Sequence, residues 1–157
     1  MNCEIRKMTA DEYPLLEKFL YLAIFIPDGV EPPPYDIIFR PELQVYTKDF
    51  GSTIHDTAFV AVCDNTIAGA VWVRIMDDYG HIDDETPSLA ISLLPEYRGQ
   101  RMGTKLMQAI IDELKERDYK QISLAVQKAN YAVKMYRKVG FEAVDENAEE
   151  YIMVCKL

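Results

Sequence analysis

The sequence has little cysteine and no long hydrophobic run. Its 3 cysteines, Cys3, Cys63 and Cys155, are far apart among 157 residues and form no C-x-x-C pair. This spacing argues against a disulfide framework or a zinc site, so no metal is expected, and it fits a reducing, cytoplasmic location. The most apolar stretch, residues 19–26, is too short to span a bilayer, and no membrane partner is expected.

Positive charge is also scarce. The chain has 17 Lys and Arg against 26 Asp and Glu, which gives a formal net charge of -9. So acidic a chain should not bind nucleic acid or anionic membranes through its overall field. The acidity suits a cationic acceptor such as an amine, although an acidic surface also serves solubility.

Two common phosphate-binding motifs are missing. No G-x-x-x-x-G-K-[ST] occurs, which excludes a P-loop, and no G-x-G-x-x-G occurs, which excludes a Rossmann dinucleotide site. Hydrophobic residues nevertheless make up 49% and charged residues 27%, as is typical of a folded globular protein. Because there is no repeat and no long linker, residues 1–157 are expected to form a single domain.

The order of predicted elements indicates a mixed α/β fold. Thr9 and Glu12 form a capping-box pattern before the first helix, and Pro41 begins a second helix that Gly51 ends. Two strand–helix–strand units in the second half imply a mixed sheet covered by helices. The predicted strands are residues 5–7, 58–63, 67–76, 88–94, 121–126, 141–144 and 151–157, and the predicted helices are 10–23, 41–50, 102–114 and 130–139.

A local island of positive charge joins the strand 88–94 to the following helix. Arg98, Arg101 and Lys105 lie close together there, with Glu96 the only nearby acid. A helix start leaves backbone N–H groups unpaired and partly positive, and glycines let the backbone close around an anion. The turn Arg98–Gly103 is therefore suited to a phosphate or diphosphate, although short glycine-rich turns also occur without a ligand.

This turn resembles a known motif. Residues 95–103, P-E-Y-R-G-Q-R-M-G, are similar to the coenzyme-A motif of GNAT acetyltransferases, Q/R-x-x-G-x-G/A. Arg98 matches the first position and Gly103 the last, whereas Arg101 replaces the middle glycine. The replacement is tolerable if only the backbone N–H of Arg101 faces the phosphates and its side chain points out.

A second segment strengthens the resemblance. Residues 130–141, N-Y-A-V-K-M-Y-R-K-V-G-F, are similar to the family signature N-x-x-A-x-x-x-Y-x-x-x-G-F. The markers Asn130, Tyr136, Gly140 and Phe141 are in place, and Ala132 is displaced by one position. Two motifs in the right order, separated by one helix and one strand, are more specific than either motif alone.

The resemblance covers residues 58–141 and implies both a fold and a reaction. It implies the GNAT fold: a mixed, mostly antiparallel sheet of six or seven strands, flanked by about four helices and splayed at its centre between 91–94 and 124–126. It also implies direct transfer of an acetyl group from acetyl-CoA to a primary amine of a small molecule or peptide. An acyl-CoA-binding module without catalysis and a non-GNAT interaction domain stay open, and the closing strands are compatible with a homodimer.

The resemblance assigns coenzyme binding to the turn and its surroundings. The polarising N–H for the thioester carbonyl is placed near Leu93. Asn130 either contacts the coenzyme arm or caps the last helix, and both roles are compatible. The implied coenzyme-binding residues are Leu93, Leu94, Arg98, Gly99, Gln100, Arg101, Met102, Gly103, Thr104, Asn130 and Tyr136.

Tyr136 is also the implied general acid, because a phenol near the sulfur can protonate the leaving thiolate. The alternative is a core aromatic, since Tyr136 shares a helical stripe with Ala132 and Val139. The resemblance also implies a general base at Glu85, because counting back along the strand from Arg98 reaches it near the position where histone-type members of the family carry a base glutamate. Carboxylates crowd there, which favours proton uptake near neutrality, whereas the alternative is a solvated acidic loop.

Overall fold

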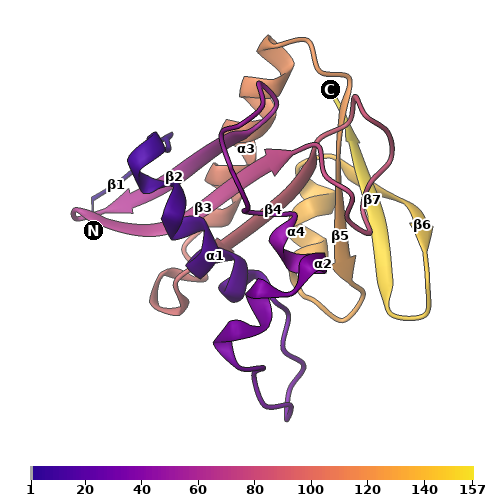
Figure 1. The fold of residues 1–157 in the computed structure, drawn as a ribbon, viewed down its shortest axis with the longest axis horizontal. Coiled ribbons are helices and arrows are strands. Elements are labelled where there is room, and N and C mark those ends of the chain that lie inside the picture. Colours follow the sequence, from indigo (N-terminus) through magenta and orange to yellow (C-terminus); the bar gives the residue numbers. More distant parts are fainter. Residues whose placement is uncertain (1) are drawn as a thin grey trace.

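The computed structural model describes residues 2–157, which fold around one seven-stranded sheet with helices on both faces (Figure 1). The strand order is β1-β2-β3-β4-β5-β7-β6, and all neighbours are antiparallel except β4 and β5, which are parallel. The strands are β1 (Cys3–Lys7), β2 (Thr57–Cys63), β3 (Thr66–Arg74), β4 (Ser88–Leu93), β5 (Gln121–Gln127), β6 (Phe141–Glu146) and β7 (Glu150–Lys156).

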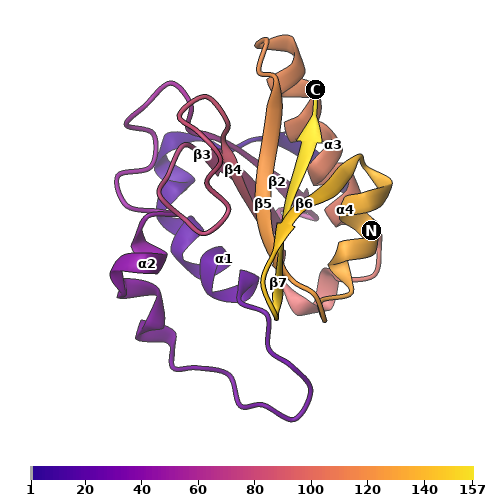
Figure 2. The same cartoon turned by 90° about the vertical axis from the view of Figure 1, so that its right-hand side faces the viewer.

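The helices form two layers. Figure 2 shows α1 and α2 on one side of the sheet and α3 and α4 on the other. No helix within residues 2–157 is long and apolar enough to cross a membrane. The α-helices are α1 (Leu16–Ala23), α2 (Pro41–Gln44), α3 (Met102–Glu116) and α4 (Ala132–Lys138), and the 3-10 helices are η1 (Ala10–Leu15), η2 (Tyr35–Phe39) and η3 (Pro95–Tyr97).

Each layer has its own apolar core. Leu106 and Ile110 of α3 are fully buried against one face of the sheet, and Leu16 and Phe19 of α1 are buried against the other, where Trp72 also lies. The four-residue period of α3 therefore does bury one side of that helix, as the sequence predicts. The mixed, mostly antiparallel sheet flanked by helices is confirmed.

Turn residues explain why the hairpins form. Asp64 and Asn65 have φ angles of 47° and 69°, the left-handed pair that a two-residue hairpin needs between β2 and β3. The predicted hairpin of the last two strands, β6 and β7, is also confirmed. The Thr9 N–H donates to Glu12 Oε1 (2.9 Å), but this pair opens η1 rather than α1, and Pro14 lies inside η1.

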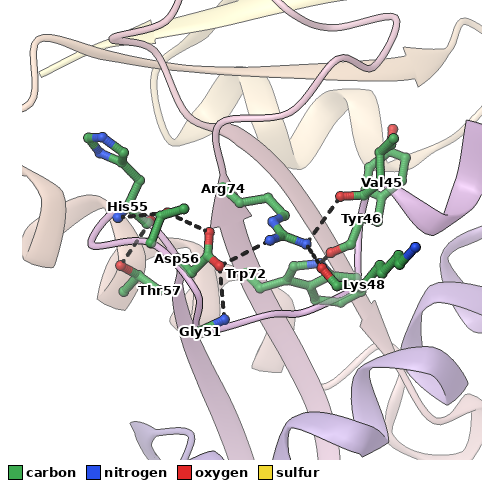
Figure 3. A network of polar contacts seen from close by, with 10 residues as sticks. Val45, Tyr46, Lys48, Gly51, His55, Asp56, Thr57, Trp72 and Arg74 are labelled. Atoms are coloured by element: carbon green, nitrogen blue, oxygen red, sulfur yellow. Dashed lines mark hydrogen bonds and ion pairs between the residues drawn. The ribbon is translucent and has the colours of Figure 1, made fainter.

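The prediction of a helix from Pro41 to Phe50 is wrong beyond Gln44. Residues 45–50 form successive turns, and side chains of β3 donate hydrogen bonds to backbone carbonyl groups of this segment (Figure 3). Trp72 Nε1 donates to the Tyr46 carbonyl at 3.1 Å, and Arg74 Nη1 donates to the Lys48 carbonyl at 2.7 Å. These carbonyls bond across to the sheet and do not continue the helical ladder.

Arg74 is the centre of this network. Its guanidinium pairs with the Asp56 carboxylate, with 3.1 Å between Nη2 and Oδ2, and the Asp56 side chain is only 1% exposed. The Gly51 N–H donates to the same carboxylate oxygen at 2.8 Å. The network therefore fastens residues 45–56 to β3 and fixes Tyr46 beside the sheet.

The expectation that no disulfide forms is also wrong. Cys3 and Cys63 are joined by a disulfide, while Cys155 is buried and free. The two bonded residues are 60 positions apart in the chain but directly opposite in the β1–β2 register. Antiparallel pairing brings them together, with 4.0 Å between their Cα atoms, and sequence spacing alone does not reveal this.

The parallel strands β4 and β5 meet only at one end. Ser88 and Ser123 form their one register pair, whereas β3 pairs with β4 along its length, and β7 pairs with β5 along its length. The Ser123 N–H donates to the Pro87 carbonyl at 3.0 Å, next to that junction. Beyond the junction the two strands diverge, which confirms the predicted splay at the centre of the sheet.

Replacing Asp56 by alanine should destabilise the fold strongly. The change leaves the Arg74 guanidinium buried without its ionic partner, which typically costs about 3–5 kcal/mol. Urea unfolding of Asp56→Ala and of Asp28→Ala, an exposed loop acid, measures this difference. Equal unfolding free energies for the two variants would contradict the role given to the network.

Candidate active site

A cavity of about 470 Å³ opens at the C-terminal end of β4, beside the start of α4. The end of β4, the start of α4 and the segment after α1 form its walls. Its polar lining is confined to a few side chains, and most of the remainder is apolar, as is usual for a ligand site. The lining residues are 21–26, Pro32, Pro33, Ile91, Ser92, Leu93, Pro95, Arg98, Asn130, Tyr131, Ala132, Met135 and Tyr136.

The predicted diphosphate turn touches this cavity through Arg98, whereas residues 99–104 follow Arg98 outside the cavity wall. Within the described chain, no backbone N–H from Gly99 to Thr104 has a protein acceptor, since the first hydrogen bond of α3 is from the Lys105 N–H to the Arg101 carbonyl. The Arg98 N–H differs, because it donates to the Pro95 carbonyl at 3.2 Å. These unpaired N–H groups lie at or just before the positive end of a helix of 15 residues, where an anion is favoured.

Charge and space at the turn favour an anion as well. Arg98 lines the cavity, and its Nε donates to the Leu93 carbonyl at 3.3 Å. Arg98, Arg101 and Lys105 are exposed, and none of them joins an ion pair in the described structure. A Cβ added to Gly99 would have no neighbour within 4 Å, so the backbone there is open to an incoming group.

Arg101 adopts a conformation that glycine adopts more easily. Its φ is 66° and its ψ is 11°, in the left-handed region. This finding explains why the motif that Arg98–Gly103 resembles has glycine in the middle. Of the other residues of the turn, Met102 is buried, and Gln100 and Thr104 are exposed. Gly103 lies so close to Met135 that a Cβ added at Gly103 would be 3.1 Å from the Met135 Sδ.

Tyr136 lies on α4, in the wall of the cavity. It is 8% exposed, and its ring packs near Phe141 with 6.1 Å between centroids. Burial raises the pKa of Tyr136 above its ordinary value, so the phenol stays protonated at neutral pH and remains a donor. Its hydroxyl makes no hydrogen bond within residues 2–157 and is not sealed from the cavity.

Asn130 has a structural partner of its own. Its Oδ1 accepts the N–H of Ala132, the first residue of α4, at 2.9 Å, although the N-cap position itself is Tyr131. Asn130 also lines the cavity, which leaves its amide nitrogen available there. Contact between Asn130 and a coenzyme arm stays a prediction.

The structure does not bring Glu85 to this site. Glu85 is exposed and lies just before β4, at the end where β4 and β5 are joined, and it lines neither this cavity nor the one described next. Leu93 does line the cavity, whereas the Leu94 N–H is already bonded to the Ala68 carbonyl at 2.8 Å. Of the two leucines, Leu93 is the one placed to face a ligand.

A second cavity, of about 280 Å³, continues between the diverging strands. It shares Ile91, Asn130 and Tyr136 with the first cavity and adds Tyr46 and Glu150. Sequence reasoning did not predict Glu150, because it belongs to an acidic turn with no motif. The two cavities also share residues 23–25, so they adjoin over six residues, of which Tyr136 is one.

A half-buried carboxylate, that of Asp78, lies beside the second cavity. Asp78 Oδ1 accepts from Ser88 Oγ at 2.9 Å, and Asp78 Oδ2 accepts from the Tyr46 hydroxyl at 3.2 Å. Burial raises the pKa of Asp78, although both hydrogen bonds oppose that shift. These bonds satisfy Asp78 and tie its loop to β4 at the closed end of the splay. His81 of the same loop also has a partner, the Met76 carbonyl at 2.9 Å from its Nδ1.

A comparison with known families identifies the combination of the turn, the splayed strands and α4. The model of the acetyltransferase (GNAT) family matches residues 22–141, which is most of the chain and includes the turn, both strands of the splay and α4. The chain belongs to the GNAT acetyltransferase family. The resemblance read from the two motifs is therefore confirmed.

Curated GNAT relatives match part of the chain. A probable N-acetyltransferase camello of Xenopus laevis is 34% identical over 54% of this chain and 37% of its own length. A [ribosomal protein bS18]-alanine N-acetyltransferase of Haemophilus influenzae is 35% identical over 43% of this chain and 47% of its own length. The chain thus spans less than half of the length of the curated relatives that it matches.

Solved GNAT structures share the whole fold. The PaiA N-acetyltransferase of Thermoplasma acidophilum, solved in complex with coenzyme A, superposes with a TM-score of 0.73 at 20% identity and covers 100% of both chains. The ribosomal-protein-S18-alanine N-acetyltransferase of Escherichia coli gives a TM-score of 0.68 at 17% identity, over 99% of this chain and 94% of its own. At these identities the likeness shows the fold alone.

Replacing Arg101 by glycine or by valine should separate backbone conformation from charge. Both variants lose the same charge, but a β-branched residue in the left-handed region is strained, whereas glycine is not. Arg101→Gly should be more stable than Arg101→Val by about 1–2 kcal/mol in chemical unfolding. Equal stabilities would mean that this turn does not require a left-handed residue.

Proposed function

We propose that this chain is an N-acetyltransferase that moves an acetyl group from acetyl-CoA to a primary amine. The observation that carries the proposal is the row of unpaired N–H groups from Gly99 to Thr104, which directly follows Arg98 in the wall of a cavity that Tyr136 also lines. Membership of the GNAT family and the splayed sheet agree with it.

The residues present suit acetyl-CoA. The N–H groups of the turn and the Arg98 side chain would hold the diphosphate by charge-assisted hydrogen bonds. The diverging edges of β4 and β5 offer backbone groups to the pantetheine arm, since neither edge is paired beyond Ser88 and Ser123. Leu93 lines the cavity near the polarising position that the family resemblance assigns.

The chemistry needs one proton donor at the sulfur. Bound acetyl-CoA would supply a thioester. The acceptor would first lose a proton to solvent, and the neutral amine would then attack the carbonyl carbon; its nitrogen would release a second proton to solvent as the carbon–sulfur bond breaks. Tyr136 would give its phenolic proton to the departing sulfur, because its hydroxyl is protonated, has no protein partner and faces the cavity. Asn130, beside it, would hold the arm.

The acceptor is a cationic amine of a small molecule or a peptide. The net charge of -9 and the acidic loop 77–85 would attract such an acceptor, and the second cavity gives it a route to Tyr136. In this proposal Glu85 does not contact the reacting amine, because it lies outside both cavities. A cytoplasmic location and a homodimer stay predictions.

A second candidate is an acyl-CoA-binding module without catalysis. The position of Glu85 favours it, since the predicted base does not line the cavity. A panel of amines assayed by release of the CoA thiol separates the two candidates: both bind acetyl-CoA, but only the enzyme releases thiol faster with an amine.

Replacing Tyr136 by phenylalanine should slow turnover. The variant removes the proton donor and keeps the ring packed against Phe141, so kcat should fall by about 10²-fold while acetyl-CoA affinity changes little. Thiol release gives kcat, and calorimetry gives the affinity.

Tyr35 serves as a matched control, since it is exposed and Tyr35→Phe removes a hydroxyl from a residue that lines neither cavity. Turnover of Tyr136→Phe equal to that of the wild type would reduce Tyr136 to a packing residue.

A further inference from the structure

The second cavity has a wall with very little charge. It lies between β4 and β5 and extends to the start of β7 and to Tyr46. Among the described residues that line it, Glu150 is the only acid, and no lysine or arginine lines it. Most other lining side chains, such as Leu20, Phe25 and Leu43, are apolar. A cation entering this space would therefore meet one carboxylate in otherwise weakly polar surroundings.

The fold fixes Glu150 at this position. Glu150 is paired with Gln127 in the β5–β7 register, and its N–H donates to Asn147 Oδ1 at 2.7 Å. The Asn147 N–H in turn donates to the Glu150 carbonyl at 3.0 Å. Both backbone groups of Glu150 are thus hydrogen-bonded in the hairpin turn, which fixes the position of its Cα atom at the cavity wall.

The nearby cations do not neutralise Glu150. Lys128 pairs with Glu146, with 2.6 Å between Nζ and Oε1, and both Lys128 and Arg137 lie over the ring of Tyr151. Tyr151 follows Glu150 in β7, and successive side chains of a strand point to opposite faces. These cations therefore gather on the face away from Glu150.

The carboxylate of Glu150 is left without a protein partner. In the structure of residues 2–157 it accepts no hydrogen bond and joins no ion pair, although the residue is half-buried. Burial, then Asp78, and then the charge of Glu150 raise the pKa of Tyr46. Asp78 accepts hydrogen bonds from Ser88 and Tyr46, so Glu150 is the carboxylate of this region that has neither a hydrogen-bond donor nor a cation among the described residues.

We propose that Glu150 is the acceptor-binding carboxylate, which pairs with the ammonium group of an amine whose apolar part occupies the cavity between β4 and β5. This inference rests on the proposed acetyl transfer, since Tyr136 lines both cavities. It makes Glu150 a specificity-determining residue, which favours acceptors that carry positive charge over neutral molecules of the same shape. A charge-assisted hydrogen bond in a partly buried site is strong enough to impose such a preference.

The test uses a pair of probes that differ in charge but not in shape. The protein is saturated with CoA, which carries no acetyl group, and is then titrated with n-hexylamine or with 1-hexanol at neutral pH. Calorimetry or amide chemical shifts give each affinity. The variant is Glu150→Gln, which keeps the size of the side chain, and the matched control is Glu149→Gln, which removes the same charge from the exposed neighbour.

The wild type and Glu149→Gln should bind hexylamine at least about tenfold more tightly than hexanol, and Glu150→Gln should lose that preference. A preference that survives in Glu150→Gln at unchanged thermal stability, or no preference in the wild type, would overturn the inference while leaving acetyl transfer intact. Failure of CoA itself to bind would overturn the proposed function, and this inference with it.

Discussion

The incomplete pairing of β4 with β5 is the constraint on which the site depends. The two strands share one register pair, Ser88 with Ser123, and then separate, while their outer neighbours hold each strand along its full length. A sheet that closed this gap would not have the second cavity. The separation leaves backbone groups unpaired inside the molecule, and such groups are costly unless water or a ligand satisfies them. The sheet is therefore built around a space that an extended ligand arm can fill.

Rigid supports surround this gap on both faces. On one face, α3 packs its apolar side against the sheet and presents its N-terminal N–H groups at the open end of the splay. On the other face, the buried pair of Arg74 and Asp56 fastens residues 45–56, which carry Tyr46 to the second cavity. Binding groups that rest on such elements lose little freedom when a ligand arrives, which preserves affinity.

The sequence predicted the part of the site that local backbone chemistry determines. The turn Arg98–Gly103 and the helix of Tyr136 follow from glycine, charge and periodicity, which act over a few residues. Glu150 and the Cys3–Cys63 bond could not be predicted in this way, because pairing between strands that are distant in the chain brings each of them to its place. The prediction of the second helix was wrong beyond Gln44 for the same reason. Trp72 and Arg74, which lie far along the chain, donate hydrogen bonds to carbonyl groups that a longer helix would use. Glu85 was placed by counting along one strand, and such counting carries no information on which end of the splay is open.

The central claim is that the N–H groups from Gly99 to Thr104 bind the diphosphate of the coenzyme. Amide chemical shifts of the nitrogen-15-labelled protein, recorded during titration with CoA, test it most directly, because each of these N–H groups reports its own hydrogen bonding. The account predicts large, saturable shifts for residues 99–104, larger than those of the solvent-exposed β6 edge. Saturable binding that leaves the amides of residues 99–104 unshifted would contradict it.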